Sequence, residues 1–285
     1  MRLSLFIKES VPALERLYPS PEARGLVLML CEERLGVRSY THIVEPGYEI
    51  PLEKLPGLEA DMSRLAAGEP IQYVLGYTEF CGRRFKVGPA VLIPRPETGQ
   101  LADEALKEAG RLPSPAKVLD LCTGSGCIAW SVALGLPGVE VTAADISEPA
   151  LELARSQFGT LPEDAVAPVF VRSDLLAVCP EIGGTFDLLL SNPPYVRESE
   201  KEAMRRNVLD YEPELALFVP DDDPLLFYRA LASAARRLLR PGGTGIVEIN
   251  EALGPETAAL FAAAGYAKTE ILKDFFGKDR FVKFS

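Results

Sequence analysis

The chain reads Val118-Leu119-Asp120-Leu121-Cys122-Thr123-Gly124-Ser125-Gly126-Cys127-Ile128-Ala129 across the segment that decides its fold. The apolar start predicts a buried strand, and the residues from Cys127 onward predict a helix. Between them, Gly124 and Gly126 allow a tight turn and a close approach of a ligand to the backbone. A strand, a glycine loop and a helix in this order are typical of nucleotide-binding α/β proteins.

Strand and helix patterns alternate from residue 117 to the end of the chain. The expected strands lie at 117–121, 139–144, 167–172, 186–191, 243–249, 268–273 and 280–285. Amphipathic helices fill most of the gaps, including 150–156 and 224–239. This alternation favours an α/β fold with a mainly parallel, doubly wound sheet, whose last two strands form an antiparallel hairpin.

The first 75 residues or so look helical instead. Ser20 and Pro21 predict the N-cap and the first position of a helix that ends at Gly36. A second helix is expected at 59–67. No catalytic constellation is visible here, so this part of the chain is interpreted as a recognition domain.

A hairpin and a connector follow the helices. The hairpin is expected around Gly82, from strands at 71–77 and 84–87. The prolines of Val91–Thr98 make the connector stiff, and its final threonine is placed to cap a helix that starts near Gln100.

At 285 residues the chain is long enough for more than one domain. We expect a helical substrate-recognition domain at 1–72, a β-hairpin and proline-rich linker at 73–97, and a catalytic domain at 98–285. Hydrophobic content of 47% and charged content of 25% predict a soluble globular protein. No apolar run is long enough for a membrane span, and Met1–Glu9 is charged too early for a signal peptide. We therefore expect a cytoplasmic protein.

Charge and cysteine usage exclude several classes of function. The formal net charge of −11 disfavours broad nucleic-acid binding, which depends on neutralising phosphates. Five scattered cysteines without a C-x-x-C pair indicate neither a disulfide framework nor a zinc site. A single histidine, His42, makes a histidine-based metal cluster or catalytic triad implausible, so we expect no metal.

Acidic residues follow two of the predicted strands. Asp145 ends the strand after the glycine loop, about where an acid accepts hydrogen bonds from ribose hydroxyls. Asp174 follows the third strand and can accept from an adenine amino group, or it can cap a helix that begins at Leu175. With the glycine loop, these acids predict an adenosine-containing cofactor.

Two cofactors fit the glycine pattern. Gly124, Gly126 and Ala129 satisfy the G-x-G-x-x-A pattern of NAD sites. Asp120, however, would repel a diphosphate, whereas it can compensate the ammonium or sulfonium group of S-adenosylmethionine. Asn192 also follows the fourth strand, across the switch point where open sheets bind ligands. These two residues favour S-adenosylmethionine.

The segment Ser191-Asn192-Pro193-Pro194-Tyr195 leaves the fourth strand as a stiff loop. Each proline lacks a ladder donor and fixes φ, so the sheet cannot continue. Asn192 offers a side-chain acceptor and Tyr195 a face for stacking, which suits a planar amino or amide group. Asn-Pro is also an ordinary turn dipeptide, so the segment by itself does not distinguish a binding loop from a turn.

Together with these motifs, further segments make the chain resemble the HemK/PrmC family of release factor glutamine N5-methyltransferases. The matching segments cover roughly residues 65–285, and the N-terminal helices match only in general character. They are Gly68–Gly76, Glu79-Phe80, Phe85–Val87, Leu92–Thr98, Asp120–Gly126, Asn192–Tyr195, Tyr211–Pro213, Phe227–Arg229 and Lys278–Arg280. Two positions depart from the family pattern, Gly99, where a glutamate is usual, and Glu251, where many members have glutamine.

The resemblance implies a class I methyltransferase fold, S-adenosylmethionine as cofactor, and the glutamine of the Gly-Gly-Gln loop of peptide chain release factors as substrate. The residues expected to bind the cofactor are Asp120, Cys122, Thr123, Gly124, Ser125, Gly126, Asp145, Asp174, Leu175 and Asn192. Those expected to bind the substrate are Arg95, Glu97, Asn192, Pro193, Pro194 and Tyr195.

Three residues of the loop are the expected catalytic residues. We hypothesise that the Asn192 side-chain oxygen and the Pro193 carbonyl accept the two hydrogens of the substrate amide, and that Tyr195 stacks on it. No general base of suitable pKa is evident, so the order of proton loss and methyl transfer stays open.

Two rival functions also stay open. One is an adenine-N6 methyltransferase on DNA or RNA, because the same loop suits the amino group of a flipped base. The acidic charge and the absence of an evident target-recognition domain disfavour it. The other is a cofactor-binding module without catalysis, which the intact loop disfavours. We expect a monomer that contacts release factors, with no direct nucleic-acid or membrane partner.

Overall fold

The computed structural model describes all residues from 1 to 285, and its residue contacts divide the chain into two units. The smaller unit contains Met1–Tyr77 and Arg205–Tyr211, and the larger contains Thr78–Met204 and Glu212–Ser285. The helical unit thus extends beyond residue 72 and includes a short segment from the second half of the chain. None of the helices is both long and apolar enough to span a membrane.

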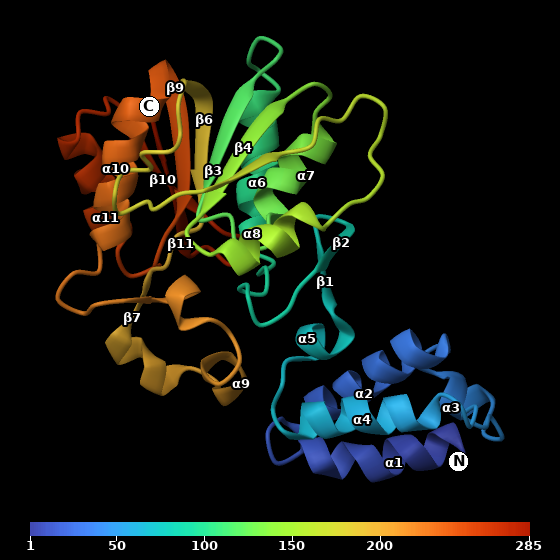
Figure 1. Cartoon of the computed structure of the whole chain (residues 1–285). Helices are drawn as coiled ribbons and strands as arrows, with labels where there is room; N and C mark the ends of the chain where they lie inside the picture. The colour runs from blue at the N-terminus through green and yellow to red at the C-terminus, as the bar shows by residue number, and fades with distance from the viewer. The chain divides into compact units, whose positions relative to one another are not determined.

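The smaller unit is built from helices around one apolar core, and its N-terminal part is coloured blue to cyan in Figure 1. Its helices are α1 (Leu3–Leu14), α2 (Ser20–Leu35), α3 (Thr41–Val44), α4 (Leu55–Ala66), α5 (Ile71–Leu75) and α9 (Arg206–Leu209). Leu14, Leu30 and Leu65, from three of these helices, are almost fully buried. The predicted cap of α2 is wrong, because Pro19 holds the N-cap position and Ser20 is already helical.

The strand predicted at 71–77 is also wrong, since this segment forms α5. Pro70 stands at its N-cap position, and Gly76 ends it with a left-handed φ of +86°. Buried Ile71 and Val74 are three residues apart, which is the spacing of one helix face. The hairpin therefore begins later, with β1 (Tyr77–Phe80) and β2 (Arg83–Lys86).

The larger unit is an α/β domain around a seven-stranded sheet in the order β10-β11-β9-β6-β3-β4-β5, seen in the upper part of Figure 1. The strands of the sheet are β3 (Lys117–Leu121), β4 (Glu140–Asp145), β5 (Val169–Arg172), β6 (Phe186–Ser191), β9 (Leu239–Glu248), β10 (Thr269–Lys273) and β11 (Asp279–Phe284). The α-helices are α6 (Thr98–Ala109), α7 (Cys127–Gly135), α8 (Glu148–Arg155), α10 (Leu226–Leu238) and α11 (Gly254–Ala263). A small parallel pair, β7 (Val196–Arg197) and β8 (Phe218–Val219), and two 3₁₀ helices, η1 (Glu198–Ala203) and η2 (Glu214–Ala216), complete it.

The predicted seven strands and the predicted topology are confirmed. Strands β9, β6, β3, β4 and β5 run parallel, and β11 is antiparallel to both of its neighbours. The chain passes from β3 outward to β4 and β5 and then returns to the other side of β3 as β6. The switch point of the sheet therefore lies between β3 and β6.

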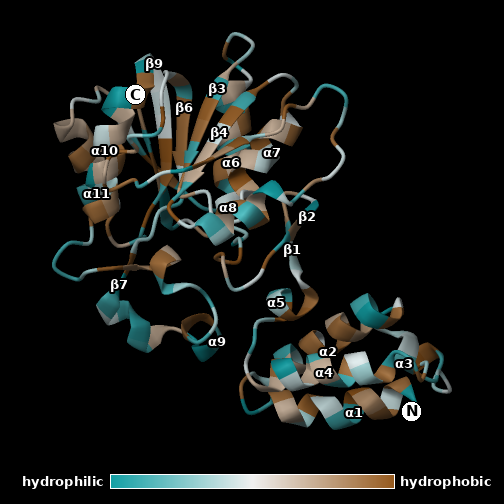
Figure 2. Cartoon of the chain, viewed as in Figure 1, coloured by the Kyte–Doolittle hydropathy of each residue, from teal (hydrophilic) through white to brown (hydrophobic).

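Helices cover both faces of the sheet, because its central strands carry apolar side chains on both sides. Leu188 and Leu190 of β6 pack in the cluster that includes α6 and α7. Leu189, between them, packs in the cluster that includes α10 and α11. Figure 2 shows the concentration of hydrophobic residues on the central strands of the sheet, and hydrophobic and hydrophilic residues alternating along the helices.

The proline-rich connector leads into α6 in a way that the sequence did not indicate. Glu97 holds the N-cap position, and Thr98 is the first helical residue, so the predicted capping role of Thr98 is wrong. The Thr98 side chain is 2% exposed and accepts a hydrogen bond from Asn192 Nδ2 at 3.2 Å. The start of α6 is thereby joined to the loop that follows β6.

Candidate active site

A cavity of about 170 Å³ lies at the carboxyl edge of the sheet, within the larger unit. Its walls come from the connector, from the loops after β3, β4 and β5, and from the loop after β6. The carboxyl ends of parallel strands meet at one edge, and the switch point opens a crevice there. The predicted residues that line the cavity are Cys122, Thr123, Gly124, Ser125, Asp145, Asp174, Leu175, Asn192 and Pro194.

The two glycines of the loop after β3 have different surroundings. Gly124, with φ of +53°, has no atom within 4 Å of the position that a Cβ would take, and it lines the cavity. Gly126, with φ of +77°, is enclosed, because a Cβ there would meet Ala154 at 3.0 Å and Trp130 at 3.2 Å. Gly124 thus leaves space for a ligand, whereas Gly126 allows α7 and α8 to pack closely.

Asp145, the last residue of β4, braces the glycine loop. Its Oδ2 accepts from the Gly124 N–H at 2.9 Å, and its Oδ1 accepts from the Ser147 N–H at 3.0 Å. Burial raises the pKa of this carboxyl, and the backbone hydrogen bonds oppose the rise. Each carboxylate oxygen keeps a further lone pair, so Asp145 can also accept from a ligand hydroxyl.

Asp120 lies under the glycine loop and is fully buried. The Thr123 hydroxyl donates to its Oδ2 at 2.6 Å, while Oδ1 has no hydrogen-bond partner. Burial raises the pKa of Asp120 to about 7, against the opposing effect of the Thr123 hydrogen bond. A buried carboxylate oxygen without a partner is costly, and a nearby cation would offset that cost.

Asp174 lines the cavity and also closes a turn. Its Oδ1 accepts from the Leu176 N–H at 2.8 Å, and Oδ2 makes no such bond. The two roles considered for this residue are therefore compatible, since one oxygen holds the backbone and the other is left for a ligand. The turn does not continue into a helix.

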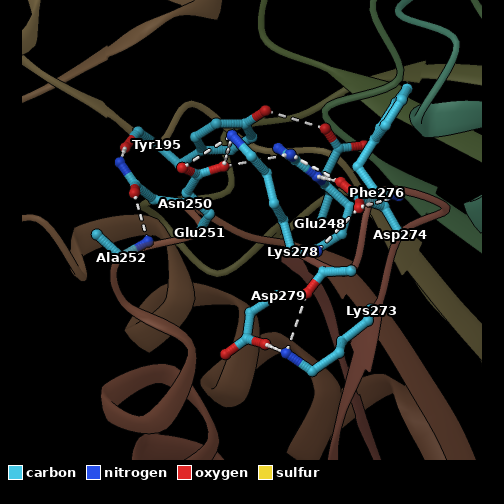
Figure 3. A network of polar contacts seen from close by, with 12 residues as sticks. Tyr195, Glu248, Asn250, Glu251, Ala252, Lys273, Asp274, Phe276, Lys278 and Asp279 are labelled. Carbon is cyan, nitrogen blue, oxygen red and sulfur yellow. Dashed lines mark hydrogen bonds and ion pairs between the residues drawn. The ribbon is translucent and has the colours of Figure 1, made fainter.

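The Asn192-Pro193-Pro194-Tyr195 loop is anchored at both ends. Before it, the Ser191 hydroxyl donates to the Leu121 carbonyl at 2.7 Å, which ties β6 to β3. After it, the Tyr195 hydroxyl donates to Glu248 Oε1 at 2.9 Å, as Figure 3 shows. Both prolines are buried, and Asn192 is partly exposed.

The structure does not bring every residue of this loop to the cavity. Asn192 and Pro194 line it, but Pro193 and Tyr195 do not. The Tyr195 ring packs against the apolar cluster beneath α10 and α11, and burial raises the pKa of its hydroxyl well above the usual value. In this arrangement the ring supports the loop from one side.

Arg95 and Glu97 also lie outside the cavity lining. Arg95 Nη2 forms an ion pair with Glu212 Oε1 at 2.6 Å, and Glu212 Oε2 accepts from the Ile93 N–H at 2.9 Å. The side chain of Glu212 is 1% exposed. This buried carboxylate holds the connector, whose neighbouring residues Pro94 and Thr98 do line the cavity.

Further polar residues around the loop were missed by the sequence analysis. Asn250 Nδ2 donates to the Tyr195 carbonyl at 3.2 Å (Figure 3). It also donates to Glu200, and Arg280 pairs with buried Asp274. Glu248, at the end of β9, is 1% exposed. The position of Glu248 was a usable signal, because an acid follows the apolar run Gly245-Ile246-Val247 at the edge of the sheet where Asp145 also lies.

The two departures from the family pattern lie outside the cavity lining. Glu251 pairs with Lys278 at 2.8 Å, so it takes part in a surface ion pair. A Cβ at Gly99 would lie 3.6 Å from Cys81 Sγ, so a side chain could begin there without displacing its neighbours.

The hydrogen-bond acceptors that line the cavity fit an adenosyl ligand. Asp145 and Asp174 offer acceptors to hydroxyl and amino groups, and Gly124 leaves room for a ligand. Asp120 keeps one carboxylate oxygen without a partner, but it is fully buried and does not line the cavity. No group of three or more His, Cys, Asp or Glu side chains could hold a metal ion. The acceptors that line the cavity thus suit the hydroxyl and amino groups of an adenosyl ligand.

The chain is also similar to known proteins over nearly its whole length. Residues 101–210 match the family model of the methyltransferase small domain, and residues 8–76 match that of the PrmC N-terminal domain. A release factor glutamine methyltransferase of Bacteroides thetaiotaomicron is 44% identical over 279 residues, covering 98% of this chain and 97% of the relative. One of Flavobacterium psychrophilum is 37% identical over 285 residues, covering 99% of each.

A solved structure is also similar, the release factor-specific protein-(glutamine-N5) methyltransferase of Alicyclobacillus acidocaldarius. It is 31% identical, covers 70% of this chain and 98% of its own, and has a TM-score of 0.43. The sequence identities over nearly the whole length decide the assignment. The chain belongs to the release factor glutamine methyltransferase family.

Proposed function

We propose that this protein methylates the side-chain amide nitrogen, N5, of the glutamine in the Gly-Gly-Gln motif of peptide chain release factors. One observation carries the proposal, namely that Asn192 lines the same cavity as Gly124 and Asp145. An amide-binding side chain thereby shares a cavity with residues suited to an adenosyl ligand. The family names support the same substrate.

S-adenosylmethionine supplies the methyl group when it is bound. On this proposal Asp145 accepts from its ribose hydroxyls, Asp174 accepts from its adenine amino group, and Asp120 compensates its positive charge. The remaining predicted contacts come from the backbone and side chains of Cys122–Gly126 and from Leu175. Gly126 does not contact the cofactor directly in this proposal. It supports the loop, because Ala154 and Trp130 fill the space around it.

The reaction requires an amide nitrogen, a poor nucleophile, to attack a methyl carbon. The new bond forms between nitrogen and the methyl carbon, the carbon–sulfur bond breaks with its electrons left on sulfur, and a proton leaves nitrogen for water. Asn192 Oδ1 and the Pro193 carbonyl would accept the amide hydrogens, and these bonds strengthen as positive charge develops on nitrogen. The same hydrogen bonds would also hold the amide nitrogen in line with the methyl–sulfur bond that breaks.

Pro193 and Tyr195 take different roles in this proposal from Asn192. Pro193 is buried and does not line the cavity, so the role of its carbonyl as an acceptor stays a prediction. Tyr195 acts as a support of the loop through Glu248, and stacking on the substrate would need its ring to leave the apolar cluster.

The proposal is tested by methyl transfer from tritiated S-adenosylmethionine to purified release factor, to DNA and to RNA, with mapping of the labelled residue. We expect label on the glutamine of Gly-Gly-Gln alone. Label on adenine would support the nucleic-acid alternative, and no label on any substrate would support a binding module. Asn192→Ala should reduce turnover about 100-fold and leave cofactor affinity close to wild type.

A further inference from the structure

The turn between β10 and β11 exposes two consecutive aromatic side chains. Phe275 is 83% exposed and Phe276 is 78% exposed. Single apolar residues on a surface are ordinary, but two large rings at the tip of one hairpin form an apolar patch. Aromatic side chains are enriched where proteins bind one another, so this patch is a candidate interaction surface.

A buried carboxylate fixes the backbone of this turn. The Asp274 side chain is fully buried, and its Oδ1 accepts from the N–H groups of Phe276 at 2.9 Å and Lys278 at 3.0 Å. Its Oδ2 accepts from Arg280 Nε at 3.0 Å. The two rings therefore project from a backbone that is held in one shape, so less conformational entropy is lost when a partner covers them.

The turn is joined to the Asn192-Pro193-Pro194-Tyr195 loop through the segment that follows β9. Asn250 Nδ2 donates to the Tyr195 carbonyl at 3.2 Å, as Figure 3 shows. Next to it, the Ile249 N–H donates to the Arg280 carbonyl at 2.9 Å. Since the Arg280 side chain holds the turn, the aromatic patch and the loop are parts of one hydrogen-bonded structure.

The sheet places the turn at the edge where the cavity lies. β11 is antiparallel to β9, so the turn that precedes β11 lies at the carboxyl end of β9. The loops after β3, β4, β5 and β6 line the cavity, whereas those after β9 and β10 do not. Neighbouring strands are about 5 Å apart, so the turn lies about 15 Å from the end of β6 along this edge. About five extended residues span that distance, so a protein substrate can reach both.

The charged side chains next to the rings are already paired. Lys273 pairs with Asp279 at 2.8 Å, and Lys278 pairs with Glu251 at 2.8 Å. A nucleic acid would need free cations to neutralise its phosphates, which these lysines do not supply. An apolar patch on a protein is the partner that fits the two rings.

We propose that Phe275 and Phe276 form a docking site for the protein substrate, which they contact outside its Gly-Gly-Gln motif. This inference rests on the proposed function, in which that substrate is a release factor. The loops around the cavity hold the cofactor and the glutamine. The aromatic pair adds affinity for the folded substrate without touching the reacting atoms.

The test compares the wild-type protein with the double variant Phe275→Ala, Phe276→Ala in methyl transfer to purified release factor at saturating S-adenosylmethionine. The KM for release factor should rise about 10-fold, with kcat and thermal unfolding close to wild type, because exposed rings add little to the fold. Replacing both by leucine keeps an apolar surface and should raise KM much less. Val169→Ala is the control, because Val169 is 61% exposed at the start of β5, the opposite edge strand.

An unchanged KM in the alanine variant would overturn the inference, as would an equal rise in Val169→Ala. A lower kcat with an unchanged KM would mean that the turn supports the active site instead. Sedimentation at the assay concentration checks whether the rings join two copies of this chain; a wild-type dimer that the alanine variant dissociates would also overturn the inference. Absence of methyl transfer by the wild-type protein would refute the proposed function, whereas efficient transfer with equal KM values would refute only the docking site.

Discussion

Arg95 and Glu212 are 117 positions apart in the chain, yet their side chains form an ion pair at 2.6 Å in which the carboxylate is buried. Removing Arg95 would leave that carboxylate with the Ile93 N–H as its remaining partner. We expect Arg95→Ala to lower the free energy of unfolding by about 2 kcal/mol, measured by urea denaturation. Adding Glu212→Gln should recover part of this loss, since the buried charge is gone; a further loss would contradict this explanation.

The two glycines of the loop after β3 should respond differently to substitution. Gly124→Ala places a methyl group in open space facing the cavity, so it should cost about 1 kcal/mol of stability but weaken cofactor binding strongly. Gly126→Ala meets Ala154 and Trp130, so it should cost about 2–4 kcal/mol. Thermal unfolding and calorimetric titration with S-adenosylhomocysteine check both. Equal stability losses would contradict the distinction.

Asp174→Asn separates the two roles of that residue. The asparagine keeps an oxygen for the Leu176 N–H but replaces Oδ2 by an NH₂ group, which cannot accept from an adenine amino group. Cofactor affinity should fall about 10- to 100-fold while stability stays close to wild type. Asp164→Asn, at an exposed carboxylate outside the cavity lining, is the control. An unchanged cofactor affinity in Asp174→Asn would mean that Asp174 only stabilises the turn and does not bind the cofactor.

Asp120 should give the ligand-free protein a distinctive pH dependence. An aspartate in the unfolded chain ionises near pH 4, whereas burial raises the folded pKa to about 7. Between these values the folded state holds a proton that the unfolded state has lost. The free energy of unfolding should therefore decrease as pH rises from about 4 to 7, by at most about 1.4 kcal/mol per pH unit from this group.

Asp120→Asn should remove this contribution in urea denaturation at a series of pH values. Part of the decrease should persist, because burial also raises the pKa of Glu248 to about 7. An unchanged pH dependence in Asp120→Asn would mean that Asp120 does not hold the proton.

The sheet and much of the cavity could be predicted from sequence, because their signals are local. Runs of apolar residues predict the strands. Because the neighbouring strands β3 and β4 are parallel, Asp145 at the end of β4 lies beside the glycine loop that follows β3. The connection of Thr98 to Asn192 spans 94 positions, and nothing near Thr98 indicates it. Threonine is common at helix N-caps, which predicted a capping role for Thr98. Instead, Thr98 is the first residue of α6 and its hydroxyl contacts Asn192.

The mistaken strand at 71–77 has a related cause. Ile71-Gln72-Tyr73-Val74-Leu75 suits a strand by composition, and the helix is favoured by Pro70 before it and Gly76 after it. The helical conformation is further stabilised because it buries Ile71 and Val74 in the core of the helical unit. Short apolar runs are ambiguous in this way, because their periodicity cannot be read over so few residues.

The helical unit is discontinuous in sequence, since Arg205–Tyr211 belongs to it. Arg205 pairs with Glu22 at 2.6 Å, and the Tyr211 hydroxyl donates to the Ala67 carbonyl at 2.9 Å. The polypeptide therefore passes between the two units at three places, after residues 77, 204 and 211. A protease cut in the hairpin would not release an intact N-terminal module, because one piece of that module stays covalently attached to the catalytic fragment. The helical unit is thus not an independent N-terminal domain. Exchanging it between relatives would require transferring both Met1–Tyr77 and Arg205–Tyr211.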